Sequence, residues 1–139
     1  MFLLRLTLNS LDTLVCIGVQ VAATIGPLQG NVDLVARYNT SLKTNRAFYT
    51  DSNCLEMQRR WYIDGQASPM GGNFFPAACG SELRDAAGGA YLSVLSDRTQ
   101  SASGVLADGL LDIMVHRRLF ATDDAGPLYI NDTGCLAVL

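Results

Sequence analysis

The sequence is poor in histidine, in clustered charge and in long apolar runs, and each shortage excludes a class of function. One histidine and four scattered cysteines without a Cys-x-x-Cys pair do not make a zinc site. A net charge of −3 without a run of lysine or arginine lacks the basic face that a nucleic-acid backbone needs. The apolar stretch at residues 13–25 is too short and too interrupted to span a bilayer. We therefore expect no metal bound by this chain, no nucleic-acid partner and no membrane span.

The chain also lacks a recognisable catalytic combination. No serine lies in a Gly-x-Ser-x-Gly turn, and His116 is the only imidazole available as a general base. A lone histidine beside two arginines in a strand is more often a surface or packing residue. Asp123 and Asp124 are sequence neighbours, which is typical of a turn rather than of the two carboxylates of a glycosidase. The sequence therefore predicts no catalytic residue in this chain.

Composition indicates one globular domain over residues 1–139. The chain is 49% hydrophobic and 17% charged, as expected of a folded chain with a core. Its four cysteines permit two disulfides in an oxidising compartment, and buried free thiols fit almost as well. These cysteines are Cys16, Cys54, Cys79 and Cys135. Two sequons predict glycosylation at Asn39 and Asn131 if the chain enters the secretory pathway.

Apolar residues recur with the two-residue period of a β-strand in several segments. The longest runs from Val15 to Ile25, where apolar side chains occupy every second position. Because Arg5 precedes this apolar stretch, a cleaved signal peptide is the alternative, but the strand period favours a strand. The same period predicts strands at residues 32–38, 91–95 and 111–115.

Turn-forming residues separate these segments, and no long amphipathic helix pattern competes with them. Asp108-Gly109 lies between Val105-Leu106 and Leu110-Leu111, a pattern that predicts a hairpin with a two-residue turn. Strands at this spacing without intervening helices are typical of an antiparallel sheet pair. We therefore predict an all-β chain with the architecture of an antiparallel β-sandwich.

Two arginine doublets and a set of aromatic residues each allow two interpretations. The doublets are Arg59-Arg60 and Arg117-Arg118, and strand alternation places the two arginines of each doublet on opposite faces of the sheet. One of them can then contact a pocket, or the arginines form ion pairs with aspartates. The aromatic residues suit either a platform for sugar rings or a sandwich core, and core filling is favoured. They are Phe48, Tyr49, Trp61, Tyr62, Phe74, Phe75 and Tyr91.

The stretch Phe48–Asn53 reads as a strand end followed by a turn. Strand alternation predicts that Phe48 and Tyr49 point to opposite faces of a sheet. The side chains of Asp51, Ser52 and Asn53 are then expected to hydrogen-bond the reversing backbone.

Five sequence blocks, in this order, resemble the C-terminal region of the lysosomal-type α-mannosidases of glycoside hydrolase family 38. The resemblance is strongest over residues 19–126. The blocks are FYTDSN with the following Arg59-Arg60, GNFFP at residues 72–76, LSDRTQ at 95–100, Asp108-Gly109, and IMVHRRL at 113–119 with Asp123-Asp124. One departure lies at Cys54, where the family pattern usually has a glycine; a positive φ angle there suits cysteine poorly.

The resemblance implies a galactose-mutarotase-like supersandwich fragment of a longer, retaining and zinc-dependent α-mannosidase of the secretory pathway, lysosome or vacuole. Such an enzyme hydrolyses terminal α-D-mannose residues of N-glycan oligosaccharides. Its N-terminal catalytic domain holds the zinc and the nucleophile and is the implied partner of this chain, which alone would be inactive. The alternatives are a free-standing carbohydrate-binding or interaction module without catalysis, and a small secreted disulfide-bonded protein.

The resemblance also assigns roles to individual residues of this chain. Arg117 and Arg118 become candidates for the rim of the mannose pocket, in contact with a mannose-containing oligosaccharide. The remaining residues would be structural parts of the motif, serving as scaffold or domain interface. These are Phe48, Tyr49, Asp51, Asn53, Asn73, Asp97 and Arg98.

Overall fold

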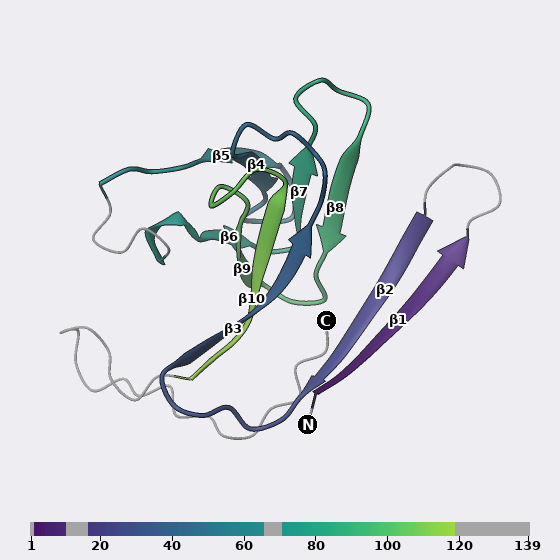
Figure 1. The fold of residues 1–139 in the computed structure, drawn as a ribbon, viewed down its shortest axis with the longest axis vertical. Coiled ribbons are helices and arrows are strands. Elements are labelled where there is room, and N and C mark those ends of the chain that lie inside the picture. The colour runs from purple at the N-terminus through teal and green to yellow at the C-terminus, as the bar shows by residue number, and fades with distance from the viewer. Residues whose placement is uncertain (1, 11–16, 66–70, 119–139) are drawn as a thin grey trace. The chain divides into compact units, whose positions relative to one another are not determined.

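A computed structural model of the chain describes residues 2–10, 17–65 and 71–118, and this part consists of strands, turns and one short 3-10 helix (Figure 1). The prediction of an all-β chain is confirmed. No helix in the described ranges has the length and apolar content to cross a membrane. The elements are β1 Phe2–Ser10, β2 Ile17–Ile25, β3 Val32–Asn39, β4 Ala47–Thr50, β5 Gln58–Trp61, η1 Gly71–Asn73, β6 Phe75–Ala77, β7 Gly80–Arg84, β8 Tyr91–Leu95, β9 Gln100–Ser103 and β10 Leu110–Arg118.

The chain divides into two compact units, one of residues 1–33 with 116–139 and one of residues 34–115. In the first unit β1 and β2 form an antiparallel pair in register from Phe2 opposite Ile25 to Ser10 opposite Ile17. The predicted strand is confirmed from residue 17 onward, and its first positions lie outside the described residues. Strand β1 was not predicted from the sequence, nor were β6, β7 and β9 of the second unit. That the whole chain forms one domain stays a prediction.

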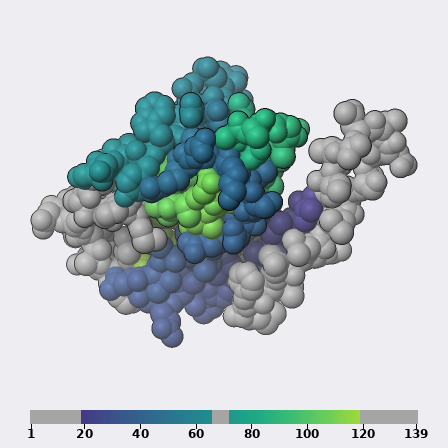
Figure 2. Space-filling model, turned by 45° about the horizontal axis from the view of Figure 1, so that its top comes forward, coloured from purple at the N-terminus to yellow at the C-terminus, as the bar shows by residue number. Residues whose placement is uncertain are grey.

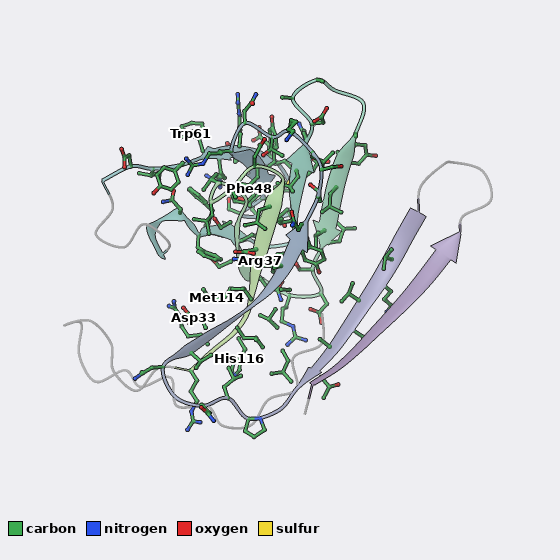
Figure 3. All side chains as sticks on the ribbon, viewed as in Figure 1. Asp33, Arg37, Phe48, Trp61, Met114 and His116 are labelled. Carbon is green, nitrogen blue, oxygen red and sulfur yellow. A yellow bond between two sulfur atoms is a disulfide. The ribbon has the colours of Figure 1, made fainter. Side chains whose placement is uncertain are left out.

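Two four-stranded antiparallel sheets make up the sandwich, and its core lies in the second unit. One sheet has the order β3-β10-β9-β6 and the other β5-β4-β7-β8. The strands predicted at residues 32–38, 91–95 and 111–115 correspond to β3, β8 and β10. Figure 3 labels Phe48, which comes from β4 and belongs to this core. The core side chains come from both sheets and the β9–β10 connection: Phe48, Ala77, Leu83, Ala102, Val105, Leu111 and Ile113.

An ion pair between an exposed arginine and a buried aspartate joins β3 to β10. The guanidinium of Arg37 donates two hydrogen bonds of 2.8 Å to the carboxylate of Asp112, of which only 1% of the side chain is exposed. Two parallel bonds in this geometry fix the planar groups relative to each other. The pair therefore holds β3 against β10 where their backbones run antiparallel.

The predicted two-residue hairpin at Asp108-Gly109 is wrong, although the turn is present. β9 ends at Ser103 and β10 begins at Leu110, so the whole segment 104–109 forms the connection. Gly109 has a φ angle of +68°, and the Asp108 carboxylate accepts hydrogen bonds from the Thr44 amide at 2.7 Å and its hydroxyl at 2.9 Å. These long-range bonds hold the connection against the segment before β4. A two-residue hairpin would move the Asp108 carboxylate away from Thr44 and break them.

Candidate functional site

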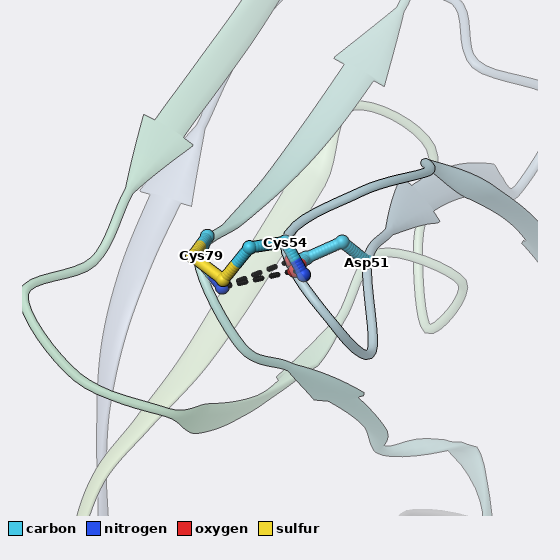
Figure 4. A group of neighbouring side chains, drawn as sticks. All are labelled: Asp51, Cys54 and Cys79. Carbon is cyan, nitrogen blue, oxygen red and sulfur yellow. Dashed lines mark hydrogen bonds between the residues drawn. A yellow bond between two sulfur atoms is a disulfide. The ribbon is translucent and has the colours of Figure 1, made fainter.

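The most elaborate polar cluster surrounds Asp51, directly after β4 (Figure 4). The residue is 3% exposed, and its carboxylate oxygens accept hydrogen bonds from three backbone N–H groups. Cys54 donates at 2.6 Å, Cys79 at 3.0 and 3.1 Å, and Gly80 at 2.8 Å. The carboxylate thus joins the turn after β4 to the start of β7, as the predicted backbone-bonding role of Asp51 requires.

The electrostatic state of Asp51 follows from these bonds. Burial works to raise the pKa of the carboxyl, but the N–H donors of Gly80, Cys79 and Cys54 outweigh burial and lower the pKa below its ordinary value. The group is therefore an anion at neutral and mildly acidic pH. Its lone pairs point at fixed backbone donors, which suits a structural anchor rather than a proton-transfer catalyst.

A disulfide joins Cys54 to Cys79 beside this carboxylate, with a Cα–Cα distance of 5.1 Å. Cys54 has a φ angle of +61°. The turn between β4 and β5 therefore has the left-handed backbone conformation at this position, although a cysteine adopts it less readily than a glycine. For Cys54 and Cys79 the disulfide alternative is the correct one. Cys16 and Cys135 lie outside the described residues.

The same three side chains form the only group in the described ranges with the spacing of a metal site, since their ligand atoms lie within 4.8 Å of one another. The donor chemistry does not fit a metal. Both sulfurs are bonded to each other, and the carboxylate oxygens of Asp51 are occupied by N–H donors.

The first arginine doublet divides between the two faces of its sheet as predicted. Arg60 is half-buried on the inner face, opposite Phe48 in the register of β4 and β5. Its Nε donates to the Thr50 hydroxyl at 3.1 Å, and its guanidinium lies 5.4 Å from the centre of the Phe75 ring. Arg59 is exposed on the outer face.

The second doublet lies at the end of β10, within the unit that also contains β1 and β2. Arg117 forms a bidentate ion pair with Asp33 at 2.6 and 2.8 Å, and Arg118 donates to the backbone carbonyl of Leu28. Figure 3 labels Asp33 and His116 in this region. Hydrogen bonding to Arg117 lowers the pKa of Asp33. The ion-pair interpretation is confirmed for Arg117, and the role of both arginines at a pocket rim stays a prediction.

The remaining motif residues make mainly local contacts. The side chain of Asn53 accepts from the Leu55 amide at 3.1 Å, and Asp97 pairs with its neighbour Arg98 at 2.8 Å. Asn73 is fully buried and bonds both backbone groups of Ile63, accepting from the amide at 2.7 Å and donating to the carbonyl at 3.2 Å.

Of the two predicted glycosylation sites, Asn39 is exposed at the end of β3. Asn131 lies outside the described residues, as do Asp123 and Asp124.

The aromatic residues follow the core interpretation only in part. Phe48 is fully buried and meets Phe75 edge to face, with ring centres 5.8 Å apart, and Tyr62 packs against the core. The core interpretation is wrong for Trp61 and Tyr91, which are 64% and 69% exposed. Both residues point to the outer face of their sheet, on its two edge strands β5 and β8.

Sequence reasoning missed a polar group on that outer face. The Arg84 guanidinium lies 3.9 Å from the centre of the Tyr49 ring, and its Nε donates to Glu82 at 2.7 Å. The Ser93 hydroxyl donates to the other oxygen of Glu82 at 2.9 Å. Alternation of Glu82 and Arg84 in a strand followed by Gly88-Gly89 was the signal available in the sequence.

Sequence comparison finds relatives among the α-mannosidases. The chain is 38% identical over 125 residues to the lysosomal alpha-mannosidase of the mouse, Mus musculus, a match that covers 80% of this chain and 12% of the mouse protein. It is 33% identical over 112 residues to the epididymis-specific alpha-mannosidase of the pig, Sus scrofa, covering 81% of this chain and 11% of the relative. It is 30% identical over 119 residues to the lysosomal alpha-mannosidase of Dictyostelium discoideum, covering 78% and 12%. No family model matches the chain.

These relatives are far longer than the chain, which spans 11–12% of their length. Within this chain, however, the matches extend over about four fifths of the residues, so they include most of the sandwich and not one motif alone. The resemblance noted in the sequence is therefore confirmed by relatives from mammals and from a slime mould. The chain belongs to the family of the lysosomal-type α-mannosidases, glycoside hydrolase family 38.

Proposed function

We propose that this chain is the C-terminal β-sandwich portion of a retaining, zinc-dependent α-mannosidase that removes terminal α-D-mannose from N-glycan oligosaccharides. The observation that carries the proposal is the 38% identity to a lysosomal alpha-mannosidase over 125 residues. The names of the mouse and Dictyostelium relatives place them in the lysosome, and the Cys54–Cys79 disulfide suits the oxidising secretory pathway that leads there.

The role of the chain in this enzyme is that of a scaffold. Two buried carboxylates of the sandwich hold parts of the chain together. Asp51 accepts a hydrogen bond from the Gly80 amide, and Asp112 forms an ion pair with Arg37. We assign the zinc that the resemblance implies to the N-terminal catalytic domain. This assignment is consistent with the one described group of suitable spacing, which is a disulfide beside a carboxylate whose oxygens already accept hydrogen bonds. No catalytic step is assigned to this chain.

Exposed apolar side chains near β5 support packing against another part of a longer polypeptide. Leu55 is 86% exposed, Trp61 64% and Ile63 38%, and all three fall within a segment of nine residues that includes β5. Large apolar side chains that stay exposed in one short segment are candidates for contact with a partner. We assign this surface to the contact with the catalytic domain. Arg117 or Arg118 is the residue that we assign to the rim of the mannose pocket.

The transcript upstream of Met1 tests the proposal. We expect the open reading frame to continue into a region with paired histidine and aspartate ligands and an aspartate nucleophile. A start codon at Met1 preceded by an in-frame stop codon would instead favour the free-standing carbohydrate-binding module.

A direct assay adds a second test. The purified 139-residue chain is expected to leave an aryl α-mannoside uncleaved, with and without added zinc. Metal-dependent turnover by this chain would contradict the assignment of the chemistry to another domain.

A further inference from the structure

An open cavity of about 340 Å³ lies at the turn between β7 and β8, and nothing in the proposed function uses it. In Figure 2 the green segment that contains this turn lies at the surface. The cavity is lined by Glu82, Arg84, Asp85, Tyr91 and the small residues of the turn. Ligand sites in proteins measure about 300–1,000 Å³, so this cavity suits one small ring rather than an extended ligand.

The polar floor of the cavity is held in place before any ligand arrives. Arg84, which lines the cavity, donates to Glu82, and its guanidinium lies 3.9 Å from the centre of the Tyr49 ring. Ser93 holds the second oxygen of Glu82, whose side chain is only 13% exposed, against 48% for Arg84. This pair therefore presents both hydrogen-bond donors and acceptors in a fixed arrangement, which lowers the entropy cost of binding a ligand with several hydroxyl groups.

Tyr91 supplies a flat apolar surface beside these polar groups. It is 69% exposed and lies directly opposite Arg84 in the register of β7 and β8, so both side chains project from the same face of the sheet. Because the Tyr49 ring is covered by Arg84, Tyr91 is the ring of this pair whose surface stays open to a ligand.

The turn leaves access to the cavity unobstructed. Gly88 and Gly89 have φ angles of +84° and +89°, and no atom lies within 4 Å of the position that a Cβ would take at either residue. The backbone of the turn therefore borders the cavity without a side chain that would close it.

We propose that this cavity binds a neutral pyranose unit of a glycan, with the sugar ring stacked on Tyr91 and its hydroxyls bonded to the Glu82–Arg84 pair. An anionic ligand is disfavoured because the lining carries two carboxylates, Glu82 and Asp85, against the single guanidinium of Arg84. The inference goes beyond the proposed function, since it holds whether the chain acts within a longer enzyme or alone.

An NMR titration of the ¹⁵N-labelled 139-residue chain tests this site. Methyl α-D-mannopyranoside, methyl β-D-galactopyranoside and inorganic phosphate are the three probes. We expect saturable shifts of the amides of residues 82–91 with at least one sugar, at millimolar concentration, and none with phosphate. The absence of saturable shifts with both sugars, or equal shifts with phosphate, would overturn the proposal.

Three variants assign the binding to the ring and to the ion pair. Tyr91→Ala is expected to weaken sugar binding about tenfold, the size of one aromatic contact, and Glu82→Gln to weaken it as well. The matched control is Leu95→Ala, which removes an 80% exposed side chain from the same face of β8 but outside the cavity lining. The amide spectrum of each variant reports directly whether it is folded. Wild-type affinity in Tyr91→Ala, or an equal loss in Leu95→Ala, would sink the assignment.

Discussion

Replacing Asp51 by asparagine should destabilise the sandwich much more than replacing an exposed aspartate. The side chain keeps its size, but one of its two oxygens becomes an NH₂ group, which donates hydrogen bonds and cannot accept them. The N–H groups of Cys54, Cys79 and Gly80 all point at this carboxylate. At least one of them therefore loses its acceptor inside a site that is 3% exposed.

The geometry sets the size of the effect. Cys79 contacts both oxygens, whereas Cys54 contacts only Oδ2 and Gly80 only Oδ1. Whichever oxygen is replaced, one donor is left without a partner, and a hydrogen bond to a charged group contributes about 1.5–3 kcal/mol. With the added repulsion of facing N–H groups, we expect a loss of about 2–3 kcal/mol, or roughly 10–20 °C in Tm for a unit of this size.

The difference in stability between the wild type and Asp51→Asn should also depend on pH. Because the pKa of Asp51 is lower in the folded chain than its ordinary value of 3.8, ionisation stabilises the fold fully above that value. The contribution disappears as the pH falls through the folded-state pKa. The gap in Tm between wild type and Asp51→Asn should therefore stay constant from neutral pH down to about the ordinary value and narrow below it.

Thermal unfolding followed by circular dichroism, without reductant and over a pH series, measures both effects. Asp97→Asn is the matched control, since Asp97 is exposed and pairs with its sequence neighbour Arg98. Its Tm should equal that of the wild type at neutral pH. The reasoning fails if Asp51→Asn melts with the wild type, or if both variants lose the same stability.

Three further substitutions or treatments probe the core and the disulfide. Phe48→Ala, at a fully buried position, should lower the free energy of unfolding in urea by about 3–5 kcal/mol. A smaller loss than that of Tyr91→Ala, which removes an exposed ring, would contradict the core assignment. Gly104→Ala should cost about 1–3 kcal/mol because its Cβ would lie 2.5 Å from the Cβ and Cγ atoms of Phe48, and a free energy of unfolding equal to that of the wild type would argue against this clash. Reduction of the disulfide, whose cysteines lie 25 positions apart, should lower stability by roughly 3–4 kcal/mol, and an unchanged Tm in reductant would show that the bond is absent or without effect.

Although β1, β6, β7 and β9 were not predicted, the strands with a clear two-residue period were predictable, because a half-buried strand alternates apolar and polar residues. Tyr91–Leu95 is an example, with exposed Tyr91 and Leu95 on one face and inward Leu92 and Val94 on the other. Strand β1 carries the same signal, since Leu4, Leu6 and Leu8 alternate with polar residues, but Arg5 and the apolar stretch after it also fit a signal peptide. The prediction for Phe48–Asn53 is confirmed for the two rings, which lie on opposite faces, and for Asp51 and Asn53, which bond the reversing backbone; for Ser52 it stays a prediction.

The candidate sites were less predictable because they depend on pairings across long sequence distances. Asp51 meets Cys79 and Gly80 only because β4 pairs with β7. Nothing in the local sequence of Asp51 specifies that partner strand. The exposure of Trp61 and Tyr91 likewise follows from their positions on the outer face of the two edge strands, which no second layer of their own unit covers.

The disulfide also has a consequence for proteolysis. The Cys54–Cys79 bond closes a segment of the chain that contains the exposed residues Leu55 and Trp61. A protease that cuts between the two cysteines would break the backbone without releasing a fragment, because the bond keeps the two pieces covalently joined. Such a nick would leave the mass of the chain unchanged on a non-reducing gel, apart from one added water, and would appear as two bands only after reduction.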